Sequence, residues 1–100
     1  MKSAAMEIVG ILDQVLAIVK RVPQELIWQS RYSDEQELVD DLTDHARRIG
    51  QGDLSRLPDL SFLFLPTGPL CEIAASSGWL DAYTVLGNRF DELHSFPHQP

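Results

Sequence analysis

Three side chains that could bind a divalent metal ion stand four residues apart in the middle of the chain. Glu37, Asp41 and His45 would lie along one face of a helix, because residues four apart are neighbours on a helical surface. Two carboxylates and an imidazole suit first-row transition metals. No other histidine has a matching position, since His94 and His98 lie close to the C-terminus. We therefore keep a site for a small ligand or a divalent metal ion at these three residues as an alternative function. The function that we favour, given at the end of this section, needs no cofactor.

The same segment is strongly acidic. Of the 15 acids in the chain, six fall between residues 34 and 44 without any base, which leaves nine acids against eight bases elsewhere. Most of the six would project away from an apolar stripe that includes Leu38 and Leu42, and Arg48 stands at the favourable spacing to pair with Asp44. Such a face either attracts a basic protein partner or only keeps a small protein in solution. The candidate partner-binding acids are Asp34, Glu37, Asp40, Asp41 and Asp44.

Large apolar side chains gather near Pro23, where regular structure is expected to break. Ile27, Trp28 and Tyr32 lie in this region. Tryptophan and tyrosine are enriched at the energetic centres of interfaces, but a tryptophan in a small domain is also a common core residue. We keep both interpretations of Trp28 and include it among the candidate partner-binding residues.

Neither the single cysteine nor the proline-rich turn predicts catalysis. Cys71 stands among Leu70, Ile73 and two alanines, as a small buried apolar residue would, and no base accompanies it. The turn at residues 66–69 has one glycine, two prolines and no nearby lysine, whereas a phosphate-binding loop needs several glycines and a lysine. We therefore predict no catalytic residue and a protein that is not an enzyme.

Composition excludes several other classes of protein. One hundred residues with 44% apolar side chains can form one domain with its own core, so we expect a single domain over residues 1–100. One cysteine excludes an internal disulfide and favours a reducing compartment, hence the cytoplasm. Eight bases against 15 acids argue against nucleic-acid binding. Gly10, Asp13 and Gln14 interrupt the apolar stretch near the N-terminus, so neither a signal peptide nor a membrane span is expected.

Hydrophobic periodicity predicts an all-α fold with three longer helices, near residues 4–22, 34–49 and 79–94. The first helix is apolar over about half its circumference, which indicates cover on two sides. In the second, Ser33 and Gln36 form a capping box, and Gly50 is expected to turn left-handed after the end. His45 borders the stripe of this helix, where a hydrogen bond to Asp41 would satisfy it without a metal. The third helix carries an apolar seam. This seam consists of Trp79, Tyr83, Leu86, Phe90 and Leu93.

Two or three short helices or turns are expected between the longer ones. Pro23 can open one over residues 24–28, and Asp53 can cap a brief turn that ends before Pro58. Thr67 can cap a helix over residues 70–75 that Gly78 ends. Periodicity does not decide whether the short apolar run at residues 60–65 is a strand or a helix. A strand would have to pair across a dimer, because nothing else in the chain resembles one, so a helical turn or an extended core segment is the simpler interpretation. Residues 95–100 are expected to form a frayed tail.

These observations predict a non-catalytic protein-protein interaction domain. The acidic face would bind a basic partner, as a regulator, an adaptor or an inhibitor would; compact acidic immunity proteins that neutralise basic toxins have a similar size and charge. A homodimer is also expected if the three helices offer more apolar surface than one chain can cover. Nucleic acid and membrane are not among the expected partners.

Overall fold

The computed structural model describes residues 4–27, 31–65 and 68–95. Within these ranges the chain is all-α, as expected, and contains no strand. Its helices are α1 (Ala4–Arg21), α2 (Glu35–Gly50), α3 (Leu57–Leu63), α4 (Pro69–Ser77) and α5 (Leu80–Ser95). The predicted tail at residues 96–100 and the candidate residue Trp28 lie outside the described residues.

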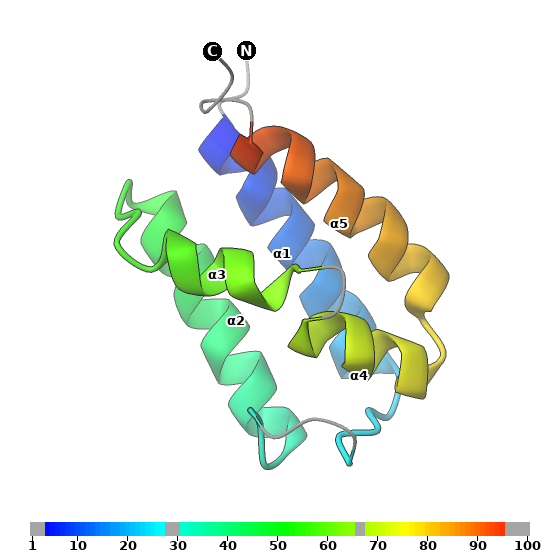
Figure 1. Cartoon of the computed structure of the whole chain (residues 1–100). Coiled ribbons are helices and arrows are strands. Elements are labelled where there is room, and N and C mark those ends of the chain that lie inside the picture. Colours follow the sequence, from blue (N-terminus) through cyan, green and yellow to red (C-terminus); the bar gives the residue numbers. More distant parts are fainter. Residues whose placement is uncertain (1–3, 28–30, 66–67, 96–100) are drawn as a thin grey trace.

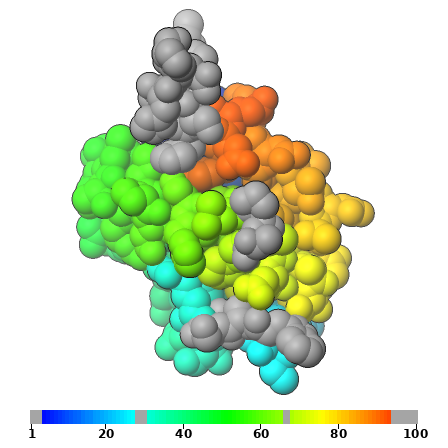
Figure 2. Space-filling view, viewed as in Figure 1, coloured from blue at the N-terminus to red at the C-terminus, as the bar shows by residue number. Residues whose placement is uncertain are grey.

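Helix α1 lies at the centre of the fold. It packs between α2 and α5, while α3 and α4 lie across one face of this group (Figure 1). In the space-filling view from the same side, α3, α4 and α5 form most of the surface and little of α1 is visible (Figure 2). The start of α1 lies beside the end of α5, and Arg89 Nη2 lies 2.6 Å from Glu7 Oε1 across this contact.

The wide apolar arc of α1 explains its central place. Ile8, Leu12, Val15 and Val19 are buried and contribute to one core with the buried faces of the other helices. The expected cover on two sides of this helix is therefore confirmed. The seam of α5 is buried as expected at Trp79, Tyr83, Leu86 and Phe90, and partly buried at Leu93.

The two ends of α2 differ by a residue or two from the expected ends. Asp34, not Ser33, is the N-cap, and its side chain accepts a hydrogen bond from the Glu37 backbone N–H. The Glu37 carboxylate accepts from the N–H of Ser33, the residue before the N-cap, so a modified capping box forms around Asp34 and Glu37 rather than Ser33 and Gln36. At the other end Gly50 is still helical, and Gly52 is the residue with positive φ, at 83°.

The short elements also correct the sequence-based expectations. Residues 24–27 are not helical, although Pro23 could have opened a helix there. Asp53 accepts a hydrogen bond from the Ser55 N–H in the loop before α3, and α3 continues past Pro58, which stands in its first turn. Because α3 extends to Leu63, residues 60–63 of the apolar run are helical, and the strand alternative for this run is wrong.

The cap of α4 is Gly68, and the predicted cap Thr67 lies outside the described residues. Gly78 ends this helix in the left-handed conformation, as expected, with φ of 86°. Gly68 is needed for a different reason, since a Cβ at this position would lie 2.7 Å from the Phe62 carbonyl oxygen. The end of α3 and the start of α4 approach too closely there for any side chain.

We expect Gly68→Ala to lower the free energy of unfolding by about 1–3 kcal/mol, because backbone atoms must move to admit the methyl group. Gly10→Ala is the matched control. A Cβ at Gly10, inside α1, meets no atom within 4 Å, so alanine should stabilise the protein by about 0.5–1 kcal/mol through its helix propensity. Urea unfolding of both variants measures the difference, and an equal effect at the two glycines would contradict the close approach.

No helix in the described part of the chain has the length and apolar character that crossing a membrane requires.

Candidate functional site

The acids of α2 divide into two groups with different surroundings. The first group lies in and before the first two turns of the helix, and its side chains are exposed. No described lysine or arginine forms an ion pair with any of them. We call this group the acidic patch. It consists of Asp34, Glu35, Glu37 and Asp40.

The hydrogen bonds of the acidic patch are all to uncharged groups. The Gln24 backbone N–H donates to Glu35 Oε2 at 2.6 Å, and the Gln36 side-chain amide donates to Asp40 at 2.8 Å. Asp34 and Glu37 serve the capping box. These bonds hold the carboxylates in place but bring no positive charge from the described residues to them.

The second group, Asp41 and Asp44, is neutralised by arginines. Arg56 Nη1 lies 2.8 Å from Asp44 Oδ2, and its Nη2 lies 2.8 Å from Asp41 Oδ1. Arg48 Nε also lies 2.8 Å from Asp44, which confirms the pair expected from the spacing, and Arg47 contacts the same carboxylate. Hydrogen bonds from Arg48, Arg56 and Arg47 hold the pKa of Asp44 well below its usual range.

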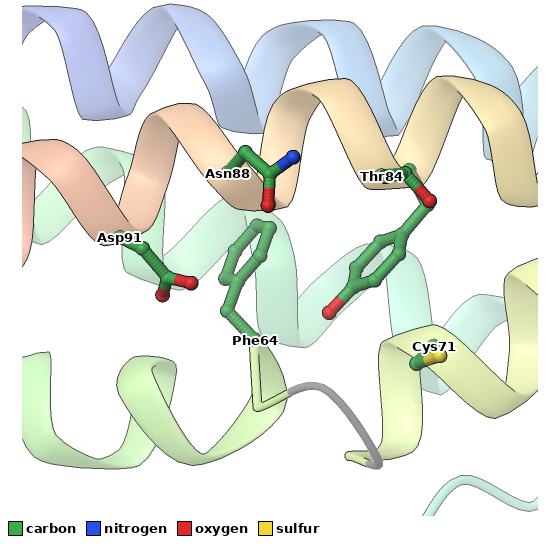
Figure 3. A pocket seen from close by; sticks show the side chains of 7 residues that line it. Phe64, Cys71, Thr84, Asn88 and Asp91 are labelled. Carbon is green, nitrogen blue, oxygen red and sulfur yellow. The ribbon is translucent and has the colours of Figure 1, made fainter.

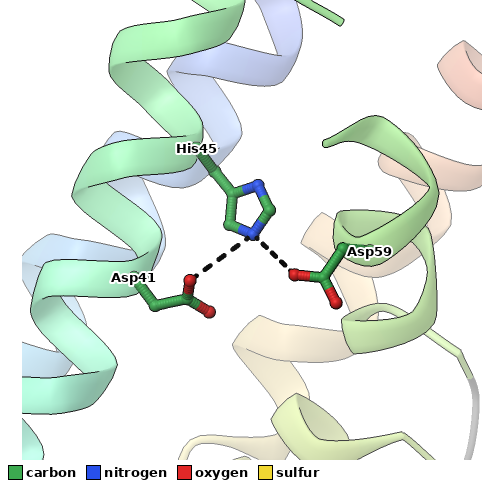
Figure 4. Close-up of side chains that lie close together, drawn as sticks. All are labelled: Asp41, His45 and Asp59. Atoms are coloured by element: carbon green, nitrogen blue, oxygen red, sulfur yellow. Dashed lines mark ion pairs between the residues drawn. The ribbon is translucent and has the colours of Figure 1, made fainter. Parts of the chain in front are cut away.

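His45 is buried between α2 and α3, with 1% of its surface exposed. Its Nε2 points between two carboxylates, 3.4 Å from Asp59 Oδ2 and 3.8 Å from Asp41 Oδ1 (Figure 4). Among the described residues, neither ring nitrogen has a partner with hydrogen-bond geometry, so the predicted bond to Asp41 is absent. Burial lowers the pKa of His45, and the positive charge of Arg56 lowers it further, while Asp41 and Asp59 oppose these effects. The imidazole is therefore neutral at pH 7.

Arg56 occupies the space that His45 faces. Its Nη2 lies 2.7 Å from Asp59 Oδ2 and 2.8 Å from Asp41 Oδ1, the same two oxygens that approach the imidazole. Arg31 forms a second ion pair with Asp59, with 2.7 Å between Arg31 Nη2 and Asp59 Oδ1. Burial alone would raise the pKa of Asp59, but its hydrogen bonds to Arg56 and Arg31 lower it overall. These contacts connect α3 to α2 through charges, whereas the helices around α1 meet through apolar side chains.

The hydroxyl of Tyr32 completes this group at its edge. It donates to Asp41 Oδ2 at 2.6 Å, and the ring is buried. Burial and the hydrogen bond to Asp41 raise the pKa of Tyr32 well above its usual range. The phenol therefore stays protonated and acts as a donor to the carboxylate.

The structure brings together two of the three residues predicted as metal ligands. Asp41 and His45 contribute to one cluster, and its third member is Asp59 from α3. Their possible ligand atoms all lie within 4.8 Å of one another. Glu37 belongs to the capping box instead. Sequence spacing did not suggest Asp59 or Arg56, because both come from the helix and loop that follow α2.

A surface cavity lies between α5 and the segment that joins α3 to α4. Its volume is about 170 Å³, and Cys71 lies at its wall rather than in the core (Figure 3). The expectation of a buried Cys71 is therefore only partly met, since this side chain is half-buried. The wall residues are Phe64, Cys71, Tyr83, Thr84, Gly87, Asn88 and Asp91. Among them no general base stands beside the thiol, as nucleophilic catalysis would require.

Comparisons of the chain with protein-family models, with curated proteins and with solved structures found no match.

Proposed function

We propose that this protein is a non-catalytic interaction domain that binds a basic protein partner through the acidic patch. The observation that carries the proposal is the unequal compensation of charge along α2. Asp41 and Asp44 are half-buried and paired with arginines, whereas the four acids of the patch are exposed and unpaired among the described residues. We therefore remove Asp41 and Asp44 from the partner-binding acids expected from the sequence, and we add Glu35.

The physical cost of the acidic patch supports this proposal. Within the patch, Glu37 stands three residues from both Asp34 and Asp40, and like charges that are neighbours on a helix surface repel each other. The favourable interaction of acids with a helix N-terminus offsets part of this repulsion. A basic partner would relieve the rest, and opposite charges accelerate the encounter between proteins. A regulator, an adaptor or an inhibitor of a basic protein would use such a surface.

Two further expectations belong to this proposal. We place the domain in the cytoplasm, where its one cysteine, Cys71, would remain a free thiol. The homodimer remains a prediction. Exposed apolar side chains such as Phe62, Leu65 and Val85 are the surface that a second copy would cover.

The proposal is tested by capturing partners on immobilised protein at low and at high salt. The patch variant, Glu35→Gln/Glu37→Gln/Asp40→Asn, removes three charges and keeps an acceptor oxygen at each position. The control variant, Asp13→Asn/Glu72→Gln/Asp81→Asn, removes three exposed acids elsewhere, so both variants change the net charge from −7 to −4. Asp34 is left unchanged because it caps α2.

We expect a basic protein to be retained at low salt by the wild type and by the control variant, and to be lost from the patch variant. High salt should weaken its retention on the wild type, since exposed charges are screened. Equal retention by all three proteins would contradict the proposal. So would equal loss from both variants, which would show that net charge alone retains the partner.

A further inference from the structure

We propose that Asp41, His45 and Asp59 form a binding site for a first-row divalent transition metal ion such as Zn²⁺, and that Arg56 competes with the ion for the two carboxylates. This inference is independent of the acidic patch, whose residues are not ligands. It differs from the ligand set suggested by sequence spacing, because Asp59 takes the place of Glu37.

The separations between the candidate ligand atoms suit a tetrahedral ion. Zinc–ligand bonds of about 2.0–2.2 Å place neighbouring ligand atoms about 3.4 Å apart in a tetrahedral site. His45 Nε2 lies 3.4 Å from Asp59 Oδ2 and 3.8 Å from Asp41 Oδ1. Two of the three separations are thus close to this value, and all three ligand atoms lie within 4.8 Å of one another, so the carboxylates must close on the ion as it binds. Three protein ligands would leave a fourth position for water or a small ligand.

His45 supplies an observation that the carboxylates alone would not. It is fully buried, its two nitrogens have no hydrogen-bond partner among the described residues, and Nε2 is directed between the carboxylates (Figure 4). A buried polar atom without a partner costs stability, and a coordinated ion would supply the missing partner for Nε2. The neutral imidazole is also the form that binds metals. Nδ1 has no acceptor to orient the ring, so we expect a site weaker than a structural zinc centre.

Arg31 bonds to Asp59, but Arg56 is the described cation that bonds to both carboxylates. Its Nη2 bonds to Asp41 Oδ1 and Asp59 Oδ2, the oxygens that an ion would take. Its Nη1 bonds to Asp44 Oδ2 at 2.8 Å. The guanidinium could thus give up the two oxygens and keep its bond to Asp44. A divalent ion would then take the place of the monovalent guanidinium beside the two carboxylates.

The probe is Co²⁺, whose visible absorption is intense in tetrahedral sites with nitrogen and oxygen ligands. We expect the wild type to develop this absorption on titration and to lose it when Zn²⁺ is added in equal amount. Arg56→Gln removes the cation that bonds to both carboxylates, while Arg31 still pairs with Asp59, and should raise the affinity about tenfold. Asp59→Asn and His45→Gln should each lower it at least about tenfold. Glu37→Gln, which keeps the capping acceptor, should leave it unchanged.

Three outcomes would overturn the site. These are no tetrahedral absorption in either the wild type or Arg56→Gln, wild-type affinity in both Asp59→Asn and His45→Gln, or an equal loss in Glu37→Gln and Asp59→Asn. Circular dichroism checks that each variant is folded. If His45→Gln is unfolded, Asp59→Asn decides the question, because Asp59 is partly exposed and lies on α3. As a second measurement, Zn²⁺ but not Mg²⁺ should raise the melting temperature of the wild type.

Discussion

Replacing Phe90 with alanine is expected to lower the free energy of unfolding by about 3–5 kcal/mol. Only 1% of the Phe90 surface is exposed, and its ring stacks on Phe64 with 4.4 Å between centroids. Phe64 also stacks on Tyr83, so the two α5 aromatics and the residue after α3 form one group. Alanine would leave a cavity where α5 meets the C-terminal end of α3, and one of the contacts that hold α3 against the rest of the fold would be lost.

Urea unfolding followed by circular dichroism measures this loss. Val85→Ala is the control on the same helix, because Val85 is 69% exposed and its truncation should change the stability by less than about 0.5 kcal/mol. A loss below about 1 kcal/mol in Phe90→Ala would contradict the packing described here.

The second large effect concerns the rate of partner association. Once the partner has been captured, the patch variant should associate with it about tenfold more slowly than the wild type at low ionic strength. Its dissociation rate should change less, because the acidic patch acts at a distance before the surfaces meet. Stopped-flow mixing of the two proteins measures both rates. The control variant, with the same net charge, should associate nearly as fast as the wild type.

The longer helices could be predicted because the sequence of each one contains its own apolar periodicity and its own end signals. The apolar arc of α1 and the seam of α5 recur with the helical period, and Pro23 and Gly78 mark breaks. The predicted N-cap of α2 was wrong by one residue. Ser33 and Asp34 are both favourable N-cap residues, and the sequence alone does not show which of them caps the helix. Residues 24–27 follow Pro23, just as α3 has Pro58 in its first turn, but only α3 is helical, while Leu26 packs against the core from a non-helical segment.

The candidate sites show the same division between local and distant information. Helical spacing was sufficient to pair Asp41 with His45 and Asp44 with Arg48. It contained nothing about Arg56 and Asp59, which reach these residues only after the chain has turned back along α2. The sequence therefore showed six acids on one helix but not that arginines neutralise two of them. Because Asp41 and Asp44 are paired with arginines, we limit the proposed binding surface to the acidic patch.

The dependence of the association rate on ionic strength tests the proposed function most directly. The wild type and the control variant should associate with the basic partner fastest at low salt, and their rates should fall steeply as salt is added. The rate of the patch variant should be low throughout and depend only weakly on salt. If the patch variant and the wild type instead lose rate in parallel, Glu35, Glu37 and Asp40 do not attract the partner, and the proposed function is wrong.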